Sequence, residues 1–324
     1  MRRGLVLLAC LAAGAVCAAG PESLEDLARR AAGGAADARA LIEQRAAAGE
    51  DAAAHLMGVL HITGKGVPRN DALALDWFLR AARRGRADSQ HNAAVILERG
   101  GGTLRDPAQA RRWYRAAAEQ GFARAQAKLG ALLVDGVGGE RDPGEGKAWL
   151  EKAAAQAEPY GRMRLGMLLL EAEGAGRDVA AGARLVQQAA EAGEREARYR
   201  LALLHGTGTG VEKSDERALH WLRLSAGQGL PEAQYLLSAV YSTGRHGVPR
   251  DDAQAIAWLR RSAAQGHADA EFSLGLAYAE GRGVKRDANE ALGWMLSASR
   301  RGHAPAKAYV EKIQSQLKER GPRD

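Results

Sequence analysis

Basic side chains that follow the tryptophans are the residues of this sequence whose type and spacing most favour a binding chemistry. They are Arg80, Arg115, Lys152, Arg223, Arg260 and Arg261, and the series is interrupted by Glu43, Glu151 and Gln187. A row of cations attracts anions. If the helices that carry the row line the inner curve of a helical array, they form a positive groove for an acidic peptide or an anionic polysaccharide. The alternative is a solvated helix face in an arginine-rich chain.

Residues arranged for catalysis do not accompany these cations. Serine β-lactamases place a lysine three positions after the serine, and the repeated serines Ser225, Ser262 and Ser297 lack that lysine. The segment from Gly58 to Lys65 approaches a phosphate-binding loop, but its glycines are one residue too far apart and no hydroxyl follows the lysine. The sequence therefore predicts a protein that is not an enzyme, with no catalytic residue and no cofactor.

The histidines do not predict a metal site either. His267 and His303 occupy the same position after a turn in successive repeats, and the sequence has no His-Glu-x-x-His motif. Neighbouring helices pack about 10 Å apart. That separation is too large for the two side chains to share one metal ion, so we expect them to be exposed turn residues.

These side chains are positioned by a repeat. Successive tryptophans are separated by 36, 36, 72, 37 and 36 residues: Trp77, Trp113, Trp149, Trp221, Trp258 and Trp294. Leu185 occupies the skipped position and Leu41 precedes the series, which gives eight copies. A period of this length predicts stacked helical hairpins, in which each copy buries its apolar face against its neighbours. We expect the indole rings to lie buried between the helices.

Three further columns predict where the helices begin, end and approach each other. An aspartate six or seven positions before each tryptophan suits a helix start: Asp71, Asp106, Asp142, Asp178, Asp215, Asp251 and Asp287. A glycine eight positions after the tryptophan, or after the leucine that replaces it, suits a left-handed turn: Gly49, Gly85, Gly121, Gly193, Gly229, Gly266 and Gly302. Ala157 replaces this glycine once, so we expect an irregular turn there. A small residue recurs in the second helix, where it allows close packing: Gly58, Ala94, Gly130, Gly166, Ala202, Ser238 and Gly275.

The ends of the chain differ from its middle. Residues 1–19 combine two arginines, an apolar run and small residues at Ala18 and Ala19, which is typical of a cleaved secretory signal peptide. A lipoprotein signal ending at Cys10 is the alternative. We expect a capping helix over residues 22–36, the repeats over 37–318 and a disordered tail at 319–324. Signal cleavage would leave no membrane span and no cysteine, which suits the periplasm or the exterior of a bacterium.

The repeat resembles the Sel-one-like repeat, a relative of the tetratricopeptide repeat. Residues 252–287 carry its pattern in Trp258-Leu259, Gly266, Leu274-Gly275 and Gly283-Val284. The resemblance implies an all-α, right-handed α-solenoid of about eight helix-turn-helix repeats of 36 residues. It also implies a non-catalytic scaffold or adaptor that binds a protein. Members of one disulfide-rich branch have been linked to penicillin binding or cleavage, but this chain lacks their paired cysteines.

Together these features predict an adaptor of the bacterial cell envelope that binds an unidentified envelope protein. The alternatives are a factor that binds peptidoglycan or an anionic exopolysaccharide and, more remotely, a β-lactamase-like hydrolase. The formal charge of +7 is spread along the chain, so we do not expect nucleic acid as a partner.

Overall fold

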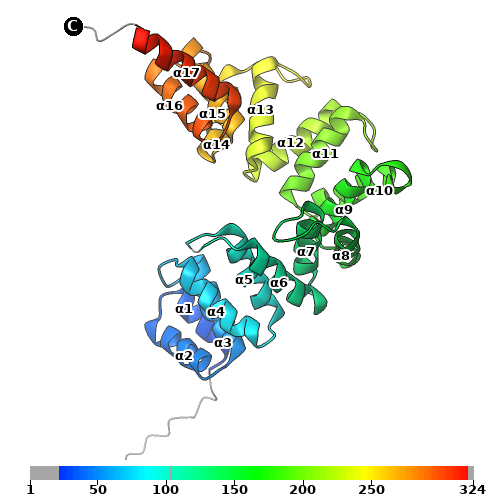
Figure 1. Cartoon of the computed structure of the whole chain (residues 1–324), viewed down its shortest axis with the longest axis vertical. Coiled ribbons are helices and arrows are strands. Elements are labelled where there is room, and N and C mark those ends of the chain that lie inside the picture. The colour runs from blue at the N-terminus through cyan, green and yellow to red at the C-terminus, as the bar shows by residue number, and fades with distance from the viewer. Residues whose placement is uncertain (1–21, 103, 320–324) are drawn as a thin grey trace, which may run out of the picture. The chain divides into compact units, whose positions relative to one another are not determined.

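A computed structural model describes residues 22–102 and 104–319, which form helices and no strands (Figure 1). The predicted signal peptide at 1–19 lies outside the described residues, as does the predicted tail beyond residue 319. The helices are α1 (Leu24–Ala32), α2 (Ala36–Ala47), α3 (Asp51–Thr63), α4 (Asp71–Arg83), α5 (Ala87–Arg99), α6 (Pro107–Glu119), α7 (Ala123–Asp135), α8 (Pro143–Ala155), α9 (Pro159–Glu171), the 3-10 turn η1 (Gly174–Gly176), α10 (Val179–Glu191), α11 (Arg195–Thr207), α12 (Asp215–Gly227), α13 (Pro231–Thr243), α14 (Asp252–Ala264), α15 (Ala268–Glu280), α16 (Ala288–Arg300) and α17 (Ala304–Glu319).

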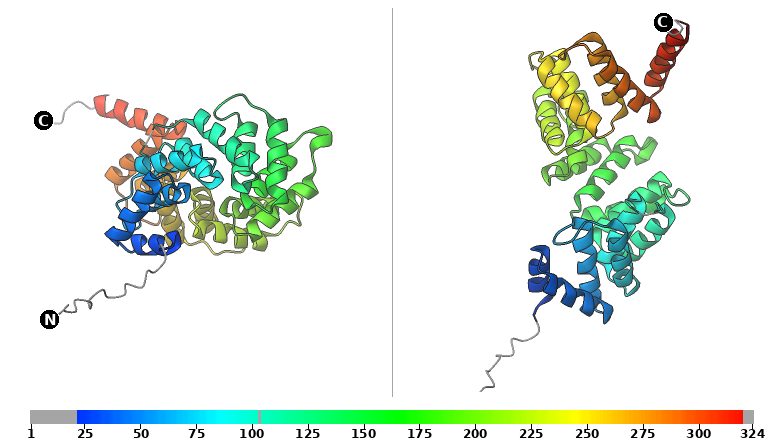
Figure 2. Two further views of the ribbon diagram at one scale, coloured as in Figure 1. Left: turned by 90° about the horizontal axis from the view of Figure 1, so that it is seen from below. Right: turned by 90° about the vertical axis from the view of Figure 1, so that its left-hand side faces the viewer.

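The chain divides into two compact units, Met1–Trp113 and Tyr114–Asp324. Within each unit, a helix packs mainly against the helices that precede and follow it in the sequence (Figure 2). Contacts restricted to neighbours distinguish a solenoid from a globular domain with a single central core. The predicted all-α solenoid is therefore confirmed, and α1 lies inside the predicted capping segment.

The closest helix pairs are joined by the longer loops, not by the short glycine turns. The pairs are α3 with α4, α7 with α8, α9 with α10, α11 with α12, α13 with α14, and α15 with α16. Small residues explain the close approach: a methyl group on Gly166 of α9 would lie 2.7 Å from the carbonyl oxygen of Gly182 in α10. Each closely packed hairpin therefore begins with an odd-numbered helix. This is one helix earlier than the predicted repeat, which begins at the aspartate of an even-numbered helix.

The residue after each tryptophan fills the core. Trp77 is buried, but the other five tryptophans are only half-buried, so the predicted burial of the whole indole column is wrong. The following residues are at most 7 % exposed: Phe78, Tyr114, Leu150, Val186, Leu222, Leu259 and Met295. The small-residue column packs against these side chains, since a methyl group on Gly58 would lie 2.6 Å from a ring carbon of Phe78.

Helix starts follow the predicted chemistry with one adjustment. Five of the seven aspartates accept a first-turn amide hydrogen bond, at 2.8–3.1 Å: Asp106, Asp142, Asp178, Asp251 and Asp287. In the other two helices the capping residue is Asn70 or Ser214, one position before the aspartate. All seven caps therefore lie seven positions before the tryptophan column.

The short turns use a left-handed residue throughout. The seven predicted glycines have φ between 81° and 97°, and Ala157 adopts φ 61° in the one remaining turn, between α8 and α9. That turn also has three residues between α8 and α9, as its sister turns have between their helices. The expectation of an irregular turn is therefore wrong, because the alanine accepts the conformation that glycine takes elsewhere.

Candidate functional site

Three of the predicted groove cations stack on the tryptophans of their own helix. The charged groups of Arg80, Lys152 and Arg261 lie 4.4, 3.9 and 4.4 Å from the ring centroids of the indoles three positions earlier. Residues three apart share one helix face, which allows this cation–π contact. Lys152 and Arg261 therefore cover the exposed side of half-buried rings, and Arg80 covers the buried ring of Trp77.

The other three cations lie two positions after the tryptophan column and face a different direction. Arg115 forms two hydrogen bonds with Glu145, at 2.5 and 3.0 Å, and Arg260 donates to the hydroxyl of Tyr278 at 2.9 Å. Arg223 is exposed and has no ion pair or hydrogen bond within residues 22–102 and 104–319. The structure thus separates the six side chains into two rows, and protein groups already contact five of them.

The two sides of the stacked hairpins differ in how closely their helices approach one another. In the second unit, α9 contacts both α7 and α11, whereas the even-numbered helices α8, α10 and α12 contact one another less, and α10 carries Leu185 in place of a tryptophan. Helices on the inner side of a stacked array lie closer together than those on the outer side. Around α9, therefore, the odd-numbered helices lie on the closer side of the hairpins.

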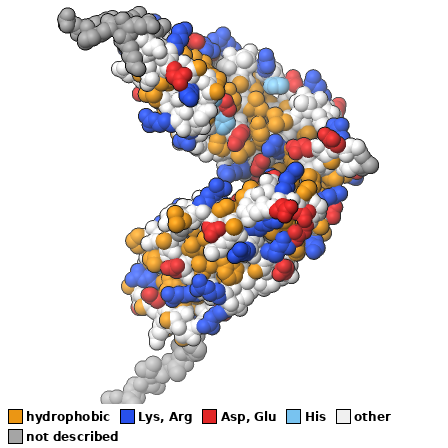
Figure 3. Space-filling view, viewed as in Figure 1, with side chains coloured by type: hydrophobic (Ala, Val, Ile, Leu, Met, Phe, Trp, Pro, Cys, Tyr) orange, Lys and Arg blue, Asp and Glu red, His pale blue; other side chains and the backbone are white. Residues whose placement is uncertain are grey.

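Two pockets of the second unit are lined by its odd-numbered helices, whereas a third, of about 730 Å³, lies beside α14 and includes Arg260. The larger of the first two, of about 650 Å³, lies between α7, α9 and α11, and we call it the α9 pocket. Its rim has equal numbers of acidic and basic residues: Asp135, Glu171, Glu196, Arg141, Arg164 and Arg200. Arg164 and Asp135 form an ion pair at 2.7 Å across α9 and α7. Lysine and arginine are likewise interspersed with acidic side chains over the face in Figure 3.

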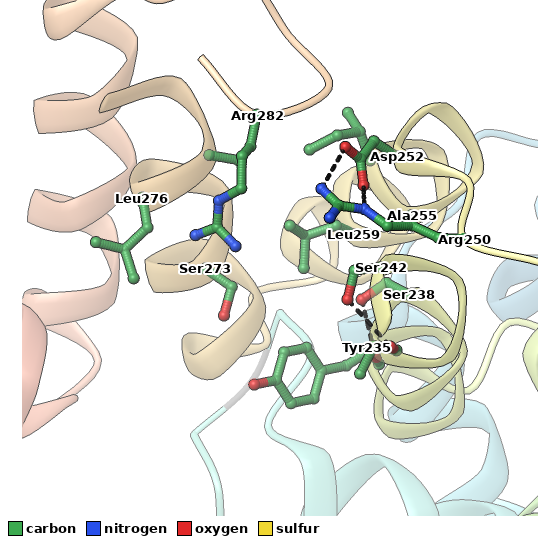
Figure 4. A pocket seen from close by; sticks show the side chains of 13 residues that line it. Tyr235, Ser238, Ser242, Arg250, Asp252, Ala255, Leu259, Ser273, Leu276 and Arg282 are labelled. Atoms are coloured by element: carbon green, nitrogen blue, oxygen red, sulfur yellow. Dashed lines mark hydrogen bonds and ion pairs between the residues drawn. The ribbon is translucent and has the colours of Figure 1, made fainter. Parts of the chain in front are cut away.

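The smaller pocket, of about 220 Å³, lies between α13, α14 and α15, and we call it the α14 pocket (Figure 4). Apolar side chains of α14 form its floor: Ala255, Ile256 and Leu259. Polar side chains surround it: Tyr235, Ser238 and Ser242 of α13, Ser273 of α15, and Arg250, Asp252 and Arg282 near the loops. An apolar floor with a few polar groups is typical of a binding site.

Sequence reasoning missed this pocket because its polar residues come from separate segments and form no motif. A weak signal was available in an aromatic column on the odd-numbered helices. Tyr199, Tyr235 and Phe272 are separated by 36 and 37 residues. This column marks the side of the hairpin on which the α14 pocket opens.

Comparison with known proteins agrees with this architecture. The model of the Sel1 repeat family matches seven segments: 51–85, 87–122, 123–158, 159–194, 195–230, 231–267 and 268–303. The chain belongs to the Sel1 repeat family. Each Sel1 repeat begins with an odd-numbered helix, so 51–85 contains the closely packed pair α3 and α4.

Solved structures with this fold come from several bacteria. A Sel1 repeat protein from Oxalobacter formigenes is 29 % identical, with a TM-score of 0.65, over 74 % of this chain and 96 % of its own. A protective antigen present in uropathogenic Escherichia coli strains is 28 % identical, with a TM-score of 0.54, over 92 % of this chain and 68 % of its own. An immunity protein from Pseudomonas aeruginosa shares the fold at 21 % identity and a TM-score of 0.50, over 68 % of this chain and 84 % of its own. No curated protein matches the chain.

The two histidines after the Sel1 repeat turns cap helices and are half-buried. His267 Nδ1 accepts from the amide of Ala270 at 3.3 Å, and His303 Nδ1 accepts from that of Ala306 at 3.1 Å. His267 also stacks on Tyr235, with ring centroids 5.1 Å apart. The expectation of exposed turn residues is wrong, because an imidazole nitrogen can replace the carboxylate oxygen of a helix cap.

One serine–lysine spacing of the β-lactamase type does occur, at Ser315 and Lys318, but the Ser315 hydroxyl donates to the carbonyl of Glu311 at 3.0 Å and lies outside both pockets. Residues 22–102 and 104–319 contain no group of three potential metal ligands. No helix in this part of the chain has the length and apolarity needed to cross a membrane.

Proposed function

We propose that this protein is a non-catalytic scaffold of the bacterial cell envelope that binds a protein partner through its odd-numbered helices. The observation that carries the proposal is that the α9 and α14 pockets both open among those helices. The cations of the tryptophan-bearing helices, in contrast, mostly contact their own protein. Envelope location is supported by the signal-like sequence at residues 1–19.

Affinity capture from a periplasmic extract tests the binding face. We expect the wild-type protein to retain one protein in constant proportion. Glu171→Lys, which reverses an exposed charge at the rim of the α9 pocket, should reduce that retention. Glu216→Lys, the same charge change at an exposed position of α12, which carries Trp221, is the matched control and should not. Equal retention by both variants would contradict the assigned face.

The remaining parts of the proposal have separate tests. Sequencing the N-terminus of the exported protein should show cleavage after Ala18 or Ala19. Co-sedimentation with purified cell wall or anionic polysaccharide, without a retained protein, would favour the polysaccharide-binding alternative. Turnover of a chromogenic β-lactam above a heat-treated control would show that the protein is an enzyme.

A further inference from the structure

Most polar groups of the α14 pocket are already paired within the protein. Ser238 and Ser242 donate their hydroxyl hydrogens to the carbonyls of Tyr235 and Ala239, at 2.6 and 3.0 Å. Arg250 forms two hydrogen bonds with Asp252, at 2.9 and 2.8 Å (Figure 4). These four side chains therefore have few donors left for a ligand.

Three donors of the same pocket have no acceptor within the described residues. They are the phenol of Tyr235, the hydroxyl of Ser273 and the terminal nitrogens of Arg282. The Nε of Arg282 pairs with Glu280 at 2.6 Å, which holds the guanidinium in place and leaves its other nitrogens unused. Figure 4 shows all three side chains beside the space between α13 and α15. Donors that converge without an acceptor suit an anion.

The charge and size of the pocket restrict that anion. Arg282 forms no hydrogen bond or ion pair with a carboxylate that lines the pocket, although, beside the hydrogen bonds from Arg250, its charge helps to lower the pKa of the Asp252 carboxyl. With one such cation and one carboxylate nearby, a monoanion matches the pocket better than a phosphate dianion. Pockets for drug-sized ligands and cofactors measure about 300–1,000 Å³. A volume of about 220 Å³ instead suits one aliphatic side chain on the apolar floor, together with a carboxylate at the rim.

We propose that the α14 pocket binds the free C-terminal carboxylate of a peptide whose last side chain is aliphatic. The carboxylate accepts from Tyr235, Ser273 and Arg282, and the last side chain lies on the apolar floor. This proposal rests on the proposed function, because it assumes that the occupant is a segment of a protein. Capture of a chain end uses both the charge and the side chain of the last residue.

Titration of the full-length processed protein with short peptides tests the proposal. The probe is N-acetyl-Gly-Gly-Leu with a free carboxylate, compared with the same peptide carrying a C-terminal amide, and binding is followed by ligand-observed NMR. We expect saturable binding of the acid, and binding at least about tenfold weaker for the amide, because a charge-assisted contact is lost. Replacement of the last residue by glycine should also weaken binding, because the floor is then uncovered.

Variants assign the effect to the pocket. Arg282→Gln should weaken binding of the acid about tenfold and leave the amide unchanged. Arg286→Gln, a nearby exposed arginine outside the α14 pocket, is the matched control and should bind as the wild type does. No saturable binding of the acid, equal binding of acid and amide, or an insensitive Arg282 variant would each overturn the proposal.

The extract experiment separates this proposal from the proposed function. If wild type and Arg282→Gln retain the same protein equally, the scaffold function stands and the carboxylate site fails. If the wild type retains no protein, the scaffold function fails whatever the peptides show.

Discussion

Ala157 is one of two non-glycine residues with a left-handed backbone in the described part of the chain, the other being His246. Its φ of 61° occurs at a position where the sister turns have glycine. A left-handed conformation costs an L-residue about 1–2 kcal/mol, and part of this is offset because alanine restricts the unfolded chain. We therefore expect Ala157→Gly to raise the free energy of unfolding by about 0.5–1 kcal/mol. Urea unfolding followed by circular dichroism measures it.

The control for this substitution is Ala257→Gly, at an exposed position inside α14. Glycine there should lower stability by about 1 kcal/mol. If both variants lose stability alike, the strain assigned to the turn does not exist.

Two glutamates at the starts of α9 and α11 predict a pH dependence. Burial raises the pKa of the Glu158 and Glu194 carboxyls above the ordinary 4.5, although hydrogen bonds from backbone amides lower it. The folded protein therefore holds these protons to higher pH than the unfolded chain does. Stability from this source is present at low pH and is lost as pH rises through the folded-state pKa values.

Glu158→Gln combined with Glu194→Gln should remove this component, because glutamine keeps an acceptor for the cap and does not ionise. We expect the variant to gain stability relative to the wild type as pH rises from about 4 to about 7. Urea midpoints across that range measure the difference. Parallel pH profiles for the two proteins would contradict the assignment.

At the scale of helices, paired glycines set the closest approach. In α9 and α10, a methyl group on either Gly166 or Gly182 would lie 2.7 Å from the carbonyl oxygen of the other. Backbone cannot move aside as a flexible side chain can, so Gly166→Ala must push the two helices apart. We expect a loss of about 1–3 kcal/mol in the free energy of unfolding, measured by urea titration.

Gly293→Ala is the matched control for this prediction. Gly293 lies inside α16, and an added methyl group there would meet no atom within 4 Å. Alanine is the better helix former, so we expect a gain of about 0.5–1 kcal/mol. A gain at both positions would show that the glycine pair does not limit helix approach.

The sequence predicted the helices better than it predicted their partners. Helix starts and turns depend on local chemistry, so the aspartate and glycine columns located them to within a residue. A periodic pattern has no natural beginning, however, so it could not show which neighbour each helix approaches most closely. The core column varies from Val186 to Tyr114 and therefore forms no visible motif, whereas the recurring tryptophans do. Tryptophan is large and seldom fully buried, which explains why the conspicuous column is only half-buried.

At the scale of the whole second unit, several successive repeats are joined by side chains that bond to the turn of the preceding repeat. Gln156, Gln228 and Gln265 donate to the carbonyls of the preceding turn glycines at 3.0–3.1 Å. Gln265 also donates to the side chain of Gln234 at 2.9 Å. In the last matched repeat this pair is replaced by Arg301 and Glu271, whose atoms lie 3.1 Å apart.

Removal of Arg301 should therefore weaken the C-terminal end of the array. Glu271 is 2 % exposed, and without the arginine its carboxylate would lack a cation. We expect Arg301→Ala to cost about 2 kcal/mol, somewhat less than a fully buried pair because Arg301 is partly exposed. The double variant Glu271→Gln, Arg301→Gln recreates the Gln234–Gln265 pair and should recover most of the loss. A double variant no more stable than Arg301→Ala would contradict this account.

A solenoid in which helices contact mainly their neighbours should tolerate removal of one complete repeat. Deletion of 195–230 joins Glu194 to Pro231, which reproduces the Glu158–Pro159 junction already present in the chain. Because α13 then follows α10 as α11 did, we expect a folded, all-helical protein. Its urea m-value should fall roughly in proportion to the lost surface. Deletion of 195–212 is the out-of-register control: it removes α11 alone, places the even-numbered helices α10 and α12 in succession and should abolish cooperative unfolding. Similar loss of helix by circular dichroism in both deletions would show that the chain does not fold as a stack of independent repeats.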